Sequence, residues 1–296
     1  MAVLKTYNGY PLWLYLPSTI AAVIFTVLFG LGAIAISWRM FTTRAWYCTA
    51  FLIGVLFQVI GYAARAAARE KTDQLMPFII QSVFILVAPA LFAASVYMVL
   101  GRVIVSIRGE RHSIIRVKWL TTLFVMGDVV SFVVQSSGAG LMVMDGMMKT
   151  GEKIIIGGLF VQIIVFGLFI VTSVLFHRRV NRHDPTTSQT YGDQWRRTLI
   201  MLYIVSVFIL VRSVFRVIEY IMGNDGYLLK NEWTLYVFDA VLMFGVVAIF
   251  AWEFPGTFKV KSAEFEMSSQ EEALSSTPQF GATTEVRAES ENKARY

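Results

Sequence analysis

The stretch Arg212-Ser213-Val214-Phe215-Arg216-Val217-Ile218-Glu219-Tyr220 places charged side chains inside a segment that is otherwise apolar enough to cross a bilayer. Successive residues of a helix are turned by about 100°, so Arg212, Arg216 and Glu219 fall on one face about 60° wide. A charge at the bilayer centre costs roughly 2.5–3.5 kcal/mol, whereas a large apolar residue returns only about 0.3–0.6 kcal/mol. These charges must therefore face protein or water, and a functional site on this face is the first hypothesis.

The composition of the whole chain is that of an integral membrane protein. Hydrophobic residues make up 56% of the 296 residues, charged residues make up 16%, and the mean hydropathy is +0.61. Seven stretches reach the roughly 20 apolar residues that a membrane-spanning helix requires. They lie near residues 17–38, 45–65, 76–102, 119–143, 154–176, 198–222 and 233–254. The sequence therefore predicts an all-α fold, a seven-helix bundle in the membrane, with no room for a soluble catalytic domain.

The Lys and Arg residues between the predicted spans indicate the orientation of the bundle. The first, third and fifth connections carry twelve of them, and the second, fourth and sixth carry six. Positive residues favour the cytosolic side, so we expect the N-terminus outside and the C-terminus in the cytosol. The same bias accounts for the formal net charge of +6, and no nucleic-acid partner is expected.

Three regions are expected along the chain. Residues 1–16 form a short extracellular N-terminal segment whose aromatic side chains suit the membrane interface. Residues 17–255 form the seven-helix domain. From residue 256 to residue 296, Ser, Thr, Glu, Gln and Ala dominate, and this composition predicts a disordered cytosolic tail.

Several predicted spans carry polar side chains on one helix face, which is typical of a bundle that encloses a site. The second span, for example, aligns Gln58 and Arg65 with two glycines, which we expect at close helix contacts. The candidate substrate-binding residues are Arg65, Gln81, Asp128, Gln135, Arg212, Arg216, Glu219, Glu232 and Asp239. Most lie in the outer half of the bilayer, Arg212 nearer the middle and Asp128 nearer the inner half. We expect the ionic side chains of the second, fourth, sixth and seventh spans to converge on one polar vestibule that opens outward.

A structural ion-pair network is an alternative explanation of the same charges. In this alternative the arginines of the sixth span pair with Glu219 or Asp239 and hold the sixth and seventh spans together. Counting Arg65 with these residues leaves a surplus positive charge, which would suit an anionic headgroup. The surplus disappears if a further carboxylate, Asp128 or Glu232, completes the balance. A cluster with a surplus positive charge and a charge-balanced cluster therefore both stay open.

The sequence lacks the signatures of common enzymatic and cofactor-dependent membrane proteins. Its histidines, His112, His177 and His183, lie in or beside predicted cytosolic loops, so no metal site is expected at membrane depth. No Gly-x-x-x-x-Gly-Lys-Ser/Thr phosphate loop occurs, and the predicted seventh span has no lysine for a retinal Schiff base. We therefore expect no cofactor and no enzymatic activity. An intramembrane enzyme acting on lipid, with Asp128 or Asp239 as acid or base, is the weakest alternative.

Short motifs along the chain carry a resemblance to a known family. They are Tyr15–Ser18, Gly61–Arg65, Gln81 with Ala88–Met98, Gly127–Gly138, Gly157–Leu159 with Gln162, Arg212–Tyr220, and Glu232 with Tyr236–Ala240. In this order and on these spans they resemble the fungal RTA-like proteins, also called the lipid-translocating exporter family. The resemblance implies a seven-span protein of fungal plasma or internal membranes. Its relatives are associated with release of sphingoid long-chain bases, resistance to sterol-like toxicants and handling of porphyrin. The family pattern includes the same candidate residues.

The residues and the resemblance together lead to one functional hypothesis and an alternative. We expect a transporter of amphipathic lipids, such as sphingoid long-chain bases or sterol-like and porphyrin-like compounds, with a role in drug resistance and stress response. Glu219 and Asp239 would suit an ammonium group, and the arginines would suit phosphate or carboxylate. The alternative is a seven-span sensor of a lipid or toxicant that signals through its basic loops and C-terminal tail. The expected partners are the amphipathic substrate and the bilayer, with a homodimer left open, and the expected location is the fungal plasma membrane or an endomembrane.

Overall fold

The computed structural model describes residues 18–69, 75–107, 111, 113, 115–142, 147–183, 194–222 and 232–255. Every regular element in these ranges is a helix, as predicted. The expected N-terminal segment, residues 1–16, and the expected tail, residues 256–296, lie outside the described residues. The properties assigned to these two regions therefore stay predictions.

Within the described ranges, seven helical spans are long and apolar enough to cross a membrane, which confirms the predicted fold class. The spans are α1 (Thr19–Thr43), α2 (Thr49–Ala68), α3 (Leu75–Ser106), α4 (Val117–Met142), α5 (Met148–His183), α7 (Gln194–Met222) and a last span that consists of α9 (Glu232–Leu235), η3 (Tyr236–Val241) and α10 (Leu242–Trp252). A short 3-10 helix, η1 (Trp46–Cys48), precedes α2. The chain is thus an integral membrane protein, and the side of the membrane that each terminus faces stays a prediction.

The helix α5 is longer than hydropathy alone predicted. It has 36 residues, Met148–His183, whereas the apolar stretch covers residues 154–176. At about 1.5 Å per residue its length is about 54 Å, well beyond the roughly 30 Å of the hydrocarbon core. Its ends therefore reach into the polar interface, where backbone hydrogen bonds continue the helix although the side chains are no longer apolar.

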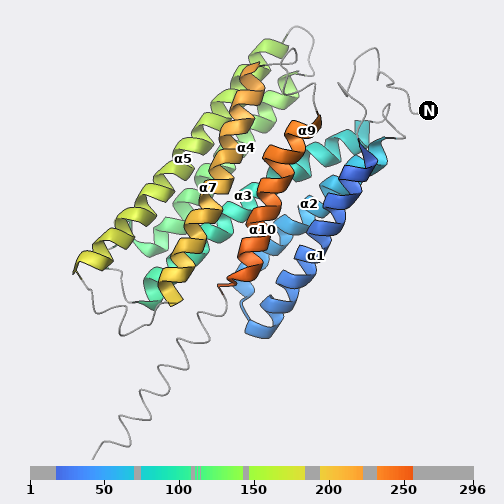
Figure 1. Cartoon of the computed structure of the whole chain (residues 1–296). Helices are drawn as coiled ribbons and strands as arrows, with labels where there is room; N and C mark the ends of the chain where they lie inside the picture. The colour runs from blue at the N-terminus through green and yellow to red at the C-terminus, as the bar shows by residue number, and fades with distance from the viewer. Residues whose placement is uncertain are drawn as a thin grey trace, which may run out of the picture. The chain divides into compact units, whose positions relative to one another are not determined.

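The last span lies between the first and second halves of the bundle. Figure 1 shows α1 and α2 at one edge and α5 at the opposite edge, with α10 and α7 between them. The helix α2 packs on α3, α4 packs on α5, and α10 packs on both α1 and α7. This arrangement brings the start of the last span next to helices that are distant from it in the sequence.

Glycines permit the close approach of α2 to α3. A Cβ atom placed on Gly54 would lie 2.8 Å from the Phe92 ring, and one on Gly61 would lie 2.6 Å from Ile85 Cγ1. Carbon atoms do not approach so closely, so a larger residue at either position would push the helices apart. The packing role predicted for these glycines agrees with these contacts. The opposite face of α2 exposes large apolar side chains, as contact with lipid tails requires.

Candidate functional site

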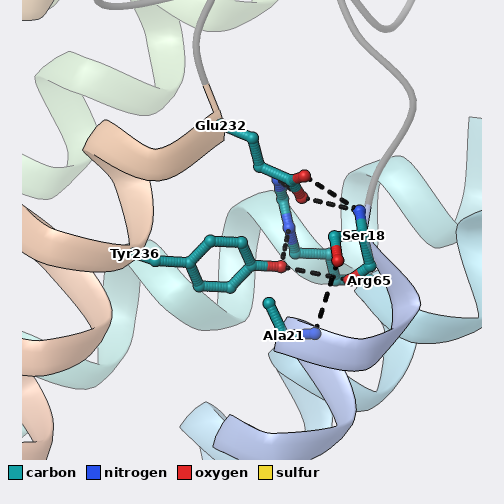
Figure 2. Close-up of polar contacts among 5 residues, drawn as sticks. All are labelled: Ser18, Ala21, Arg65, Glu232 and Tyr236. Carbon is teal, nitrogen blue, oxygen red and sulfur yellow. Dashed lines mark hydrogen bonds and ion pairs between the residues drawn. The ribbon is translucent and has the colours of Figure 1, made fainter.

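Arg65 joins α2 to the start of the last span. Only 1% of its surface is exposed, and its Nη2 lies 2.8 Å from Glu232 Oε1. Its Nε donates to the Tyr236 hydroxyl at 3.1 Å, and its guanidinium carbon lies 5.3 Å from the centre of that ring. Figure 2 shows these side chains converging from the two helices. The guanidinium is thus both paired and hydrogen-bonded, which a buried charge requires.

The beginning of α1 is tied into the same contact. The Ser18 backbone N–H donates to both Glu232 oxygens, at 2.8 and 3.0 Å, and the Tyr236 hydroxyl donates to the Ser18 carbonyl oxygen at 3.4 Å. The Ser18 hydroxyl accepts a hydrogen bond from the Ala21 N–H at 3.5 Å and so caps α1 (Figure 2). A carboxylate beside this helix N-terminus also suits the positive end of the helix dipole. Glu232 therefore holds α1, α2 and α9 together.

A second ion pair joins α7 to η3. Arg212 Nε donates to Asp239 Oδ1, and each residue is only 3% exposed. Arg212 Nη2 also donates to the backbone carbonyl oxygen of Ile85 in α3, at 3.1 Å. This carbonyl has no helical donor because the residue four positions later is Pro89, which lacks an N–H. Pro89 thus creates an acceptor inside the membrane span, and Arg212 satisfies it.

The backbone around Asp239 departs from an α-helix. Residues Tyr236–Val241 form the π-helical segment η3 between α9 and α10. A π segment adds a residue to the helical turn, which rotates the side chains that follow by about 100° relative to an uninterrupted α-helix. Tyr236 and Asp239 both lie in this segment, and both contact arginines of neighbouring helices. The hydropathy pattern contained no sign of this element.

The third arginine pairs within its own helix. Arg216 Nη1 lies 2.7 Å from Glu219 Oε2, three residues further along α7. Its guanidinium carbon lies 5.4 Å from the centre of the Tyr220 ring. Arg216 lies one turn after Arg212 on α7, so the two ion pairs of α7 are neighbours.

Together these contacts form what we call the ion network. It consists of Arg65, Arg212, Arg216, Glu219, Glu232 and Asp239. Among the described residues three arginines pair with three carboxylates, so the charges of the network balance. These pairs favour the version in which Glu232 completes the balance over the version with a surplus positive charge. The predicted ion pair between the sixth and seventh spans is confirmed as Arg212 with Asp239.

Several buried polar atoms next to the ion network have no hydrogen-bond partner among the described residues. We call the residues that carry them the unpartnered set: Gln58 with both amide atoms, Tyr62 with its hydroxyl and Gln81 with Oε1. Within the network itself, Arg216 Nε also has no partner among the described residues. Tyr62 packs on Tyr236, with ring centres 6.3 Å apart, and lies within electrostatic range of two arginines of the network. Gln58 lies one turn before Tyr62 in α2, and Gln81 lies one turn before Ile85 in α3. Unused hydrogen-bonding capacity therefore borders the network.

Two of the candidate residues, Asp128 and Gln135, contact other partners. Gln135 Nε2 donates to Gln162 Oε1 at 3.1 Å, and this bond joins α4 to α5. Asp128 Oδ2 accepts a hydrogen bond from the Tyr97 hydroxyl of α3 at 2.9 Å. The prediction that the ionic groups of four spans converge on one cluster is therefore wrong for the fourth span, because the rotation of α4 turns Asp128 toward Tyr97 instead of an arginine.

Some groups at these sites were not among the candidate residues. Ser18 and Tyr236 contact Glu232 and Arg65, and Tyr97 contacts Asp128. Two signals could have revealed part of this arrangement. Tyr236 lies one turn after Glu232 on the same helix face. Pro89 in α3 has no N–H, so the carbonyl oxygen of Ile85 needs a hydrogen-bond donor from another helix.

Comparisons with known proteins identify the family. The family model described as RTA1 like protein matches residues 51–261. The Saccharomyces cerevisiae protein named Protein RTA1 is 35% identical over 273 residues, which cover 84% of this chain and 86% of that protein. Protoporphyrin uptake protein 1, also from Saccharomyces cerevisiae, is 40% identical over 201 residues, which cover 68% of this chain and 66% of that protein.

A more distant relative is named for its substrate. Sphingoid long-chain base transporter RSB1 of Saccharomyces cerevisiae is 24% identical over 259 residues, which cover 75% of this chain and 66% of that protein. No solved structure matches the chain. The family model extends from α2 through the whole of the last span and so includes every residue of the ion network and the unpartnered set. The chain belongs to the RTA1-like protein family.

Proposed function

We propose that this protein is a transporter that moves amphipathic lipids across or out of a fungal membrane, either the plasma membrane or an endomembrane. Two relatives are named as a transporter of sphingoid long-chain bases and as a protoporphyrin uptake protein. Such compounds combine a large apolar body with polar groups. The observation that carries the proposal is the unpartnered set, because it supplies buried hydrogen-bonding groups next to a charge-balanced network.

The substrate class that fits these groups best is a long-chain amino alcohol of the sphingoid type. Gln58 is 0% exposed, and a buried amide without a partner costs about 1–3 kcal/mol. The amide offers both a donor and an acceptor, and the Tyr62 hydroxyl offers the same pair of functions. The amino and hydroxyl groups of a sphingoid base can satisfy all of these atoms, while its hydrocarbon tail stays among apolar side chains.

The carboxylates of the ion network have a different role in this proposal. Glu219 and Asp239 already bind arginines, so a substrate ammonium would have to compete with a guanidinium. Breaking a buried ion pair costs about 3–5 kcal/mol, more than a hydrogen bond to a neutral amide returns. We therefore assign the network to holding α1, α2, α7 and the last span around the site, and the recognition of the substrate head to the unpartnered set.

The proposal is tested by the flux of a labelled sphingoid base in proteoliposomes. Folded wild-type protein should accelerate flux over protein-free vesicles, and Gln58→Met should lower the rate. The same substitution should leave the free energy of unfolding unchanged or raise it, because it removes buried polar atoms that have no partner among the residues that the structure describes. Leu56→Met, on the exposed face of the same helix, is the matched control and should change neither quantity.

Two outcomes would remove the proposal. Flux through folded wild-type protein that does not exceed that of empty vesicles would exclude lipid transport under these conditions. A Gln58→Met variant that transports normally would exclude the unpartnered set as the recognition site, even if the wild type is active.

A further inference from the structure

Asp128 and Tyr97 form a buried polar site outside the ion network. Asp128 Oδ2 accepts a hydrogen bond from the Tyr97 hydroxyl at 2.9 Å, whereas Oδ1 has no partner among the described residues. Only 5% of Asp128 and none of Tyr97 is exposed. The helices α3 and α4 therefore enclose a carboxyl group that has one unused oxygen.

No cation of the described chain balances this carboxyl group. The carboxylates of the ion network each have an arginine, at 2.8 Å for Glu232 and 2.7 Å for Glu219. The only titratable side chain that faces Asp128 from the described part of α3 is Tyr97. Helix α5, which also packs on α4, presents apolar side chains here, with Val165 against Gly127 in the turn of Asp128.

The surroundings of the site are aromatic. The centre of the Tyr97 ring lies 4.6 Å from that of Phe169, 5.4 Å from that of Phe124 and 6.0 Å from that of Phe166. All four rings are buried. A carboxylate anion is stable inside a protein when a cation or several hydrogen-bond donors compensate its charge. Here a single phenol donates from the described ranges. The neutral acid, with a proton on the carboxyl group, is the form that these surroundings accommodate.

We propose that Asp128 is a proton-binding site whose loading and unloading couples lipid transport to a proton gradient. In the loaded state an O–H bond exists at Oδ1, the oxygen without a hydrogen-bond partner in the described part of the chain. The bond forms with a proton taken from water on one side of the membrane, and it breaks when the proton passes to water on the other side. This inference rests on the proposed function and supplies its energy source, since the sequence contains no phosphate-binding loop.

Infrared spectroscopy tests the proton site without transport. Wild-type protein in lipid at neutral pH should show the C=O stretch of a protonated carboxylic acid, and the band should shift in heavy water. Asp128→Asn should lack this band, whereas Tyr97→Phe should keep it at a shifted frequency, because the ring packing stays while the hydrogen bond is lost. Circular dichroism confirms that both variants are folded. A band that persists in Asp128→Asn, or its absence from the wild type, would overturn the site.

Proteoliposomes with a pH gradient test the coupling. One proton per substrate molecule allows up to about tenfold accumulation of a labelled sphingoid base per pH unit. The substrate here is the trimethylammonium analogue of the base, which has no neutral form and so does not accumulate passively as an amine. Wild-type vesicles should approach this ratio, whereas Asp128→Asn and protein-free vesicles with the same gradient should give a ratio near unity. Equal ratios for wild type and variant would overturn the coupling role. If folded wild type shows no flux at all, the proposed function and the coupling both fail, whereas the infrared band still decides whether Asp128 holds a proton.

Discussion

Replacement of Arg212 by methionine tests the claim that ion pairs hold the bundle together. The change removes the cation from the buried Asp239 and the donor from the Ile85 carbonyl. Loss of one partner of a buried ion pair costs about 3–5 kcal/mol, and an unsatisfied carbonyl in a membrane protein adds about 1 kcal/mol. Arg212→Met should therefore lower the free energy of unfolding by about 4–6 kcal/mol.

A substitution of Asp239 distinguishes two causes of this loss: the buried carboxylate left without its cation, and the packing lost with the Arg212 side chain. Asp239→Leu alone leaves the Arg212 guanidinium buried without its anion and should cost about 3–5 kcal/mol. The double variant Arg212→Met, Asp239→Leu leaves no unpaired charge at this site. Its loss in free energy of unfolding should therefore be only about 1–2 kcal/mol, from the Ile85 carbonyl and local repacking. The coupling energy between the two positions should consequently be at least about 5 kcal/mol.

Pro89 allows an independent check on the carbonyl contribution. Pro89→Ala restores an N–H that can donate to the Ile85 carbonyl within α3. In the wild type, Arg212 already donates to this oxygen. The substitution should therefore add about 1 kcal/mol more stability in the Arg212→Met background than in the wild type.

The assay is unfolding by SDS in mixed micelles, followed by tryptophan fluorescence, with circular dichroism as a check on helix content. Wild type, both single variants, the double variant and the two Pro89→Ala variants are compared at one lipid-to-detergent ratio. The reasoning is refuted if Arg212→Met costs less than about 1 kcal/mol, the usual cost of an ordinary substitution. It is also refuted if the double variant is as unstable as the sum of the single variants, since the charges would then not be coupled.

The remaining predictions concern other contacts. Glu232→Gln should lower the free energy of unfolding by about 1–3 kcal/mol in the same SDS titration, because its bonds to Arg65 and to the α1 N-terminus lose their charge. Gly158→Ala should cost about 1–3 kcal/mol, since its Cβ would lie 2.8 Å from Gln135 Cγ, whereas the adjacent Gly157→Ala, with nothing within 4 Å, should be neutral or stabilising. Deletion of residues 256–296 should leave flux in proteoliposomes intact, whereas loss of flux would favour the sensor alternative.

The spans and the inward face of α7 could be predicted because both depend on a single segment. Hydropathy reports the length and composition of each span, and helical periodicity fixes which side chains share a face. Neither hydropathy nor helical periodicity shows which helices pack against each other in the bundle. Glu232 and Arg65 are 167 positions apart in the sequence, so their pairing depends on the arrangement of the helices in space. The π-helical turn at Asp239 likewise arises from packing, and no composition signal marks it.

Asp128 illustrates the same limit. Its charge and its position within a span resemble those of Asp239, so both were expected in one cluster. The rotation of α4 decides between them, because it places Asp128 against Tyr97 of α3 and Gln135 against Gln162 of α5. Tyr97 lies in a strongly apolar segment, where a tyrosine is expected to serve packing. The role of its hydroxyl becomes visible only when α4 is in place.

Charge balance and unused hydrogen-bonding capacity are separate properties of this bundle. The balanced ion pairs stabilise the arrangement of the helices, and the unused hydrogen-bonding groups are available to a substrate. A network in which every carboxylate has an arginine can lie in a medium of low polarity without attracting ions of either sign. The amides of Gln58 and Gln81 add nothing to that balance and lower stability, so folding does not explain them. Local costs of this kind are typical of functional positions. The two substitutions should therefore have different effects on transport. Gln58→Met should slow transport at every pH gradient, whereas Asp128→Asn should abolish the dependence of accumulation on the pH gradient.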